Sequence, residues 1–65
     1  MKETNYSRAK RLWAEAHDQL SRDGFVYWLC AMYGAMEAYN AFPSKVLDVM
    51  EERIATLKEE EGRKT

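Results

Sequence analysis

The stretch of sequence that decides the fold is FVYWLCAMYGAMEAYNAF, residues 25–42. It holds six of the chain's eight aromatic residues, and Glu37 is its only charged residue. A helix that is apolar on nearly every side is buried by its neighbours. We therefore expect a central helix over about residues 25–41, stopped by Phe42-Pro43 because the residue before proline is pushed out of the α region. At steps of three and four, one face of this helix carries Phe25, Trp28, Leu29, Met32, Met36 and Tyr39.

The opposite side of this helix carries a row of small residues spaced four apart, Cys30, Gly34 and Ala38, flanked by Ala31 and Ala41, and two tyrosines lie off the main apolar row. Small side chains let a second backbone approach closely, whereas a glycine inside a helix otherwise costs about 1 kcal/mol relative to alanine. Tyrosine combines a large contact area with a polar tip and is enriched at interfaces. The predicted protein interface consists of Tyr27, Cys30, Tyr33, Gly34, Ala38 and Ala41.

A first flanking helix is predicted over about residues 5–22. Thr4 or Asn5 can cap its start, because a short side-chain oxygen accepts from the free backbone N–H groups there. Asp23-Gly24 is expected to end it, since glycine readily takes the left-handed conformation that follows many helices. Asp23 could also cap the helix that follows. The apolar stripe of the first helix is Tyr6, Ala9, Trp13, Ala16 and Leu20, with Leu12 at its edge.

A third helix is predicted over about residues 45–58, with Ser44 as its N-cap. Residues 60–65 are expected to form a mobile tail, because Gly62 and a run of glutamates at the negative end of the helix dipole disfavour further helix. The apolar stripe of this helix is Val46, Met50, Ile54 and Leu57, with Leu47 beside it. The predicted fold is therefore an all-α three-helix bundle, or a helical hairpin plus a third helix, in one domain over residues 1–65.

Size and composition favour association. A chain of 65 residues buries only about 60% of the surface that its unfolded form exposes, and such chains are often marginal alone. Cys30 is the only cysteine and His17 the only histidine, so neither an internal disulfide nor a zinc site is expected to supplement the core. We expect the bundle to be completed by association into a homodimer.

The sequence also favours a soluble, cytoplasmic chain with no membrane partner. Residues 1–22 are amphipathic and charged and contain no apolar core of a secretory signal. The longest apolar run, from Phe25 to Met36, is shorter than the roughly 20 residues that a membrane span needs. A lone cysteine in an apolar run suits a reducing compartment and is more typical of a small buried hydrophobe than of a reactive thiol.

No enzyme is expected. The chain has no glycine-rich phosphate loop and no HExxH, CxxC or GxSxG motif. His17 and Asp18 are adjacent in sequence, which on a helix points their side chains about 100° apart. We predict no catalytic, cofactor-binding or metal-binding residues and no cofactor.

The sequence thus predicts a non-enzymatic protein–protein interaction module: an adaptor, an assembly factor or an inhibitor of a larger machine. Small helical proteins of this kind are frequent among phage and mobile-element products, which makes that origin a hypothesis from base rates alone. The alternative is a small dimeric DNA-binding regulator that uses a basic first helix. Nucleic acid is the less favoured partner because the sequence pI is about 5.8. The residues that could contact phosphate are Lys2, Arg8, Lys10 and Arg11.

Overall fold

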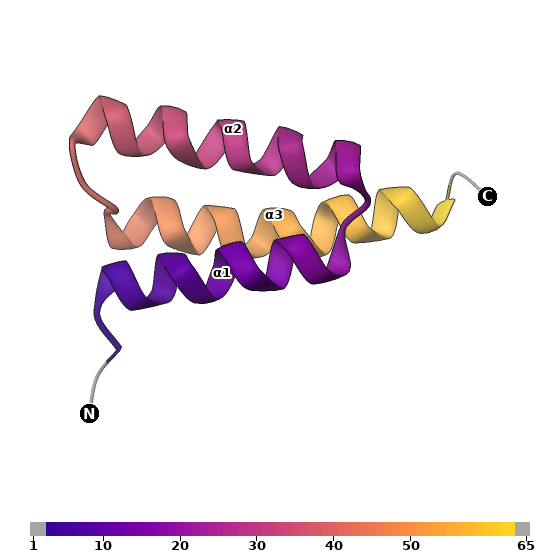
Figure 1. The fold of residues 1–65 in the computed structure, drawn as a ribbon, viewed down its shortest axis with the longest axis horizontal. Helices are drawn as coiled ribbons and strands as arrows, with labels where there is room; N and C mark the ends of the chain where they lie inside the picture. The colour runs from indigo at the N-terminus through magenta and orange to yellow at the C-terminus, as the bar shows by residue number, and fades with distance from the viewer. Residues whose placement is uncertain (1–2, 64–65) are drawn as a thin grey trace.

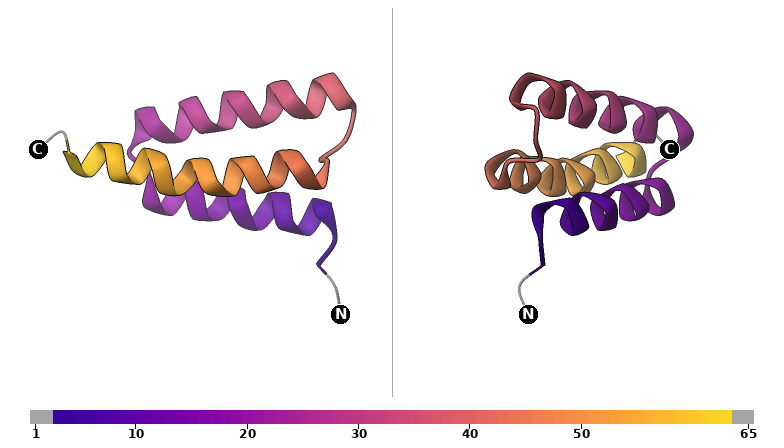
Figure 2. Two further views of the ribbon diagram at one scale, coloured as in Figure 1. Left: turned by 180° about the vertical axis from the view of Figure 1, so that it is seen from behind. Right: turned by 60° about the vertical axis from the view of Figure 1, so that its left-hand side comes forward.

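The computed structural model describes residues 3–63, which form three α-helices joined by two short turns (Figure 1). They are α1 (Asn5–Gln19), α2 (Arg22–Tyr39) and α3 (Ser44–Arg63). Each helix packs against the other two, and α3 is seen in the middle of the bundle in Figures 1 and 2. The described part of the chain contains no strand, so the all-α class with three helices is confirmed there.

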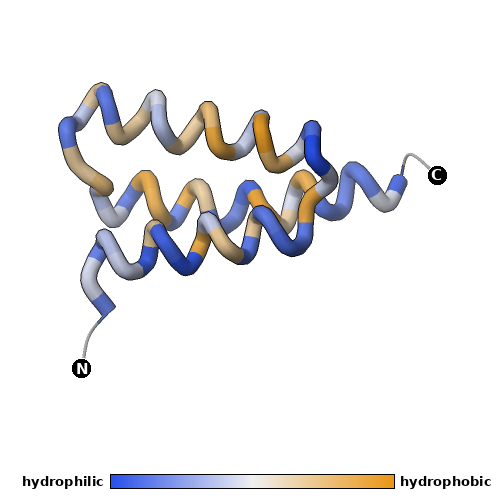
Figure 3. Tube along the Cα trace, viewed as in Figure 1, coloured by the Kyte–Doolittle hydropathy of each residue, from blue (hydrophilic) through white to orange (hydrophobic). Residues whose placement is uncertain are grey.

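The core is centred on Trp28, whose side chain is 0% exposed. Its indole Nε1–H donates a hydrogen bond of 2.9 Å to the backbone carbonyl of Met50, so the polar atom of this large side chain is satisfied where water cannot reach it. Strongly hydrophilic positions gather toward the two ends of α2, whereas in α1 and α3 they recur along the helix (Figure 3). The buried core residues are Ala9, Leu12, Ala16, Leu20, Trp28, Met32, Leu47, Met50 and Ile54.

The apolar stripe of α1 is rotated from the expected one. Leu12, expected at the edge, is fully buried, whereas Tyr6 and Trp13 are 64% and 39% exposed. The buried residues of α1 and its C-cap are Ala9, Leu12, Ala16 and Leu20, which are three, four and four residues apart. This spacing fits the helical period as well as the expected row does. The rotation places the two aromatic side chains at the edge of the core instead of inside it.

The turn between α1 and α2 also differs from the expectation. α1 ends at Gln19, Leu20 is its extended C-cap, and Ser21 rather than Asp23 caps α2. The Ser21 hydroxyl accepts from the Gly24 N–H at 3.2 Å and donates to Glu61 Oε2 at 2.7 Å. Gly24 lies in the first turn of α2 and has no positive φ. The break between the two helices is therefore made by a serine that caps the free Gly24 N–H of α2, and not by a left-handed glycine that ends α1.

The later boundaries are shifted by one to five residues. α2 ends at Tyr39 because Asn40 adopts the left-handed conformation, with φ of 55°, which asparagine tolerates better than most residues. Ser44, the expected cap, is the first residue of α3, and its hydroxyl donates to Asn5 Oδ1 at 3.1 Å. The expected tail is helical as far as Arg63; residues 64–65 lie outside the described range. Thr4 caps α1 as expected by accepting from the Ser7 N–H at 3.0 Å.

Candidate protein-binding surface

The outer face of α2 is not covered by any other part of residues 3–63. We use this name for Tyr27, Cys30, Tyr33, Gly34 and Ala38, all of which are exposed. Tyr27 and Tyr33 are large apolar side chains that are 58% and 49% exposed. The two flanking helices therefore leave aromatic surface of α2 in contact with water. Ala41, which the sequence placed on this face, is exposed but lies beyond the end of α2.

Gly34 has no structural reason to be glycine within the described chain. A Cβ atom built at this position would meet nothing within 4 Å, and the residue has no positive φ. Gly24 is the contrasting case, because a Cβ there would collide with the Glu61 carboxylate that holds Ser21. A glycine in the middle of a helix lowers helix stability by about 1 kcal/mol relative to alanine. At Gly34 no contact inside the described chain offsets this cost.

An apolar groove lies on one side of the outer face, where α1 and α2 run past each other. α1 contributes Tyr6, Lys10 and Trp13, and α2 contributes Met32, Tyr33 and Met36. The cavity volume is about 450 Å³, within the range of known ligand sites. Tyr33 belongs to both this groove and the outer face. We call this feature the α1–α2 groove.

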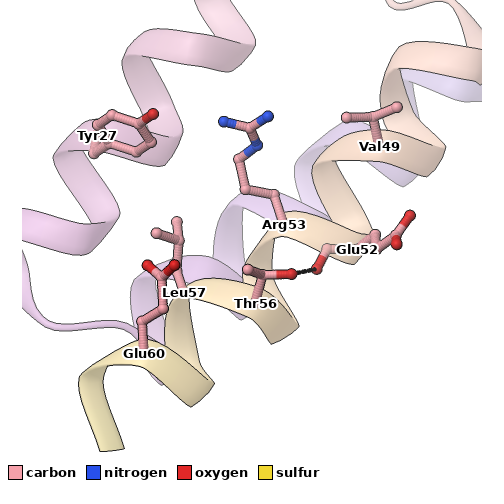
Figure 4. Close-up of a pocket in the computed structure, with 7 residues that line it drawn as sticks. All are labelled: Tyr27, Val49, Glu52, Arg53, Thr56, Leu57 and Glu60. Carbon is pink, nitrogen blue, oxygen red and sulfur yellow. Dashed lines mark hydrogen bonds between the residues drawn. The ribbon is translucent and has the colours of Figure 1, made fainter. Parts of the chain in front are cut away.

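A second hollow, of about 580 Å³, lies on the other side of α2 and is more polar. Tyr27 enters it from α2 and the remaining lining residues come from α3 (Figure 4). Arg53 rises from α3 in the middle of this hollow, and Glu52 and Glu60 line it with Leu57 (Figure 4). Two carboxylates and one guanidinium give the hollow a mixed charge, in contrast to the α1–α2 groove.

The basic residues of α1 are not equally free to bind an anion such as phosphate. Arg8 forms ion pairs with Asp48 at 2.6 Å and Glu51 at 2.7 Å. Arg11 pairs with Glu3 at 3.0 Å and lies 3.7 Å from Glu15. Side-chain hydrogen bonds, first with Glu51 and then with Asp48, raise the pKa of Arg8. A side-chain hydrogen bond with Glu3 raises the pKa of Arg11. Both are thus partly neutralised by carboxylates of the same chain.

Lys10 is the exception. Its ammonium lies 5.5 Å from the centroid of the Tyr6 ring, within the range of a cation–π interaction. Within residues 3–63 it has no carboxylate at ion-pair distance. Lys2, the fourth residue considered for phosphate contact, lies outside the described residues. The predicted basic cluster therefore divides into two paired arginines and one unpaired lysine beside the α1–α2 groove.

His17 belongs to an aromatic cluster at the end of α1. Its ring stacks on that of Trp13, with centroids 5.4 Å apart and planes at 5°. Phe25 meets both rings edge-on. No group of three potential metal-binding side chains occurs among the residues that the structure describes.

Sequence reasoning missed the contribution of α1 to this surface. Tyr6 and Trp13 were assigned to the core stripe, yet they line the α1–α2 groove. The one available signal was Leu12, which fits a second row in which the two aromatic residues fall at the edge. Size also favoured that row, because alanine and leucine allow helices to pack more closely than tyrosine and tryptophan do.

Comparison with protein-family models, with curated protein sequences and with solved structures gives no match. In residues 3–63, none of the three helices combines the length and the apolar character that crossing a bilayer requires.

Proposed function

We propose that this chain is a non-enzymatic protein–protein interaction module, of the adaptor, assembly-factor or inhibitor type, that presents the outer face of α2 to another polypeptide. The observation that supports this proposal is the exposure of Tyr27 and Tyr33 on the same side of α2 as Gly34. Interfaces are enriched in tyrosine and depleted in charge at their centre. The outer face contains both tyrosines and none of its five residues is charged, although exposed Glu37, four residues after Tyr33, lies on the same side of α2.

We propose a second copy of the chain as the first partner of this face. When two identical helices cross about a two-fold axis, a residue near the axis meets its own counterpart. With Gly34 at that position, the two backbones can approach closely. If the two helices run antiparallel, Cys30 of one chain comes near Ala38 of the other. Such a contact would explain a glycine for which the described chain gives no reason. Each tyrosine ring would then cover apolar surface of the other copy.

The geometry favours this proposal over the DNA-binding alternative. A phosphate-binding helix needs cations that are free to replace condensed counterions. Arg8 and Arg11 already contact carboxylates of α3 and of the N-terminal part of the chain. The acidic groups beside them would also repel a nucleic-acid backbone.

Sedimentation equilibrium of the full chain tests the proposal. We expect a mass twice the 7.6 kDa of the monomer at high protein concentration. Gly34→Leu should shift the equilibrium to monomer, because a branched side chain holds the two backbones apart. Ala14→Leu is the matched control: it adds the same side chain at an exposed position of α1 and should leave the mass unchanged.

Two results would count against the proposal. A wild-type chain that stays monomeric at the highest attainable concentration would refute self-association. An equal loss of dimer in the Gly34→Leu and Ala14→Leu variants would refute the role of the outer face. Circular dichroism of each variant establishes that the fold is retained.

A further inference from the structure

The α1–α2 groove has an apolar floor and aromatic walls that are open to solvent. Met32 and Met36 lie in it between the exposed rings of Tyr6 and Trp13 from α1 and Tyr33 from α2. Methionine side chains are flexible and polarisable and adapt to differently shaped apolar partners. The groove can therefore accept apolar side chains from a partner without a change in the backbone.

The dimensions of the groove fit two turns of a helix. From Tyr6 to Trp13 the chain advances seven residues, which is roughly 10 Å along α1 at 1.5 Å per residue. A partner helix lying along the groove would present apolar residues at positions i, i+3 or i+4, and i+7 over that length, the spacing by which amphipathic helices dock in grooves. Phe42, which also lines the groove, packs against Tyr6 with ring centroids 6.4 Å apart.

The lining of the groove carries one charge, a cation, whereas Glu37 lies in an adjoining hollow that shares Tyr33 and Met36 with the groove. Lys10 is the only charged residue among those that line it. Its ammonium is held near the Tyr6 ring, and within the described range no carboxylate pairs with it. Arg8 and Arg11 on the same helix are ion-paired and do not line the groove. A carboxylate on a partner helix would form an ion pair with Lys10, on the α1 side of the groove and away from Glu37 on α2.

We infer that the α1–α2 groove binds an acidic amphipathic helix of a different protein, with apolar side chains against Met32 and Met36 and a carboxylate at Lys10. This inference rests on the proposal that the chain is a protein-binding module, but it concerns a different partner and a surface that shares only Tyr33 with the outer face. α3, the chain's own acidic helix, cannot supply this helix, because its apolar residues Leu47 and Ile54 are buried in the core of its own bundle.

The test uses the full chain and two designed peptides of about 15 residues, a length at which an Ala-rich helix is stable enough to form. Both carry leucine at i, i+4 and i+7. One has glutamate beside this stripe, and the other has lysine at the same positions. The affinity of each fluorescently labelled peptide is measured by anisotropy. The binding site is mapped by amide chemical shifts.

We expect the acidic peptide to bind about two- to fivefold more tightly than the basic one, the effect of one solvent-accessible ion pair. Lys10→Glu should reverse this order. Lys45→Glu is the matched control: it changes the net charge equally at an exposed position of α3 that does not line the groove, so it should preserve the order. Tyr6→Ala, which removes an exposed ring from the groove, should weaken both peptides.

Several results would overturn the inference. They are equal affinity for the two peptides, reversal by Lys45→Glu as well as by Lys10→Glu, or chemical shifts confined to the α2–α3 side. If the wild type is a dimer and the Lys10→Glu variant is a monomer, a second copy of the chain fills the groove. The sedimentation experiment with Gly34→Leu stays independent, since the groove can fail to bind either peptide while the outer face still dimerises.

Discussion

Replacing Gly34 by alanine should have opposite effects on the stability of the monomer and on its association. In the monomer the added methyl group meets nothing within 4 Å, and no positive φ forbids it. The full difference in helix propensity, about 1 kcal/mol, should therefore appear as increased stability. For a domain of this size that corresponds to a rise in Tm of about 4–8 °C.

Thermal unfolding followed by circular dichroism measures this effect. The protein must be dilute enough to be monomeric, because association adds its own stabilisation by mass action. The control is Gly24→Ala, also in α2, where the methyl group would displace the Glu61 carboxylate from Ser21. Losing these hydrogen bonds costs about 1 kcal/mol. That loss should cancel the gain in helix propensity.

If dilute Gly34→Ala protein melts at or below the wild-type temperature, the reasoning is wrong, because position 34 would then have a packing role inside the monomer. An equal stabilisation by Gly24→Ala would show that the contact with Glu61 is unimportant. At high concentration Gly34→Ala should dimerise more weakly than the wild type, since even a methyl group separates two backbones that cross at this residue.

Four further predictions follow from the structure, three from substitutions and one from the reactivity of a thiol. Trp28→Phe should lower the free energy of unfolding in urea by about 2 kcal/mol, through loss of a buried hydrogen bond and of packing; the same change at half-exposed Trp13 should cost much less. Ser21→Ala should cost about 1–2 kcal/mol, because it removes both the cap of α2 and a partner of the α3 carboxylate; hydrogen exchange should locate the loss at the α1–α2 turn. The exposed thiol of Cys30 should react rapidly with a disulfide reagent in dilute solution and slowly in the dimer, and equal rates would place it outside the interface. Arg8→Ala should lower Tm at low salt and have a smaller effect at high salt, because the ion pairs it removes are accessible to solvent.

The existence and order of the three helices could be predicted because their apolar residues repeat with helical period. The rotation of α1 could not, because two overlapping rows of its residues satisfy the same period. The smaller residues of the observed row favour it, but this signal is weaker than the helical period, which the two rows share.

The helix boundaries were predictable only where a cap acts locally. Thr4 caps its own helix, and its role follows from the adjacent residues. Ser21 was overlooked because the nearby Asp23-Gly24 is a stronger local signal for a helix end. What makes the serine effective is Glu61, forty residues further along the chain, and no local pattern could reveal that partner.

The candidate surface could be predicted only in part, because contacts between residues that are distant in the sequence leave no local pattern. Residues on the outer face of α2 follow from one helical period, and Tyr27 and Tyr33 are exposed as expected. The α1–α2 groove requires knowing how two helices pack, and which of three neighbouring bases is already ion-paired. Lys10 was therefore grouped with arginines whose charge is used within the chain.

The bond between Ser21 and Glu61 has a consequence for how the chain is made. The turn that starts α2 is translated forty residues before the carboxylate that completes its hydrogen bonds. The turn therefore cannot close until residue 61 has been made and α3 has packed against it. Until then the nascent chain exposes the aromatic residues of α2, and a chaperone or a waiting partner could bind them before the bundle closes.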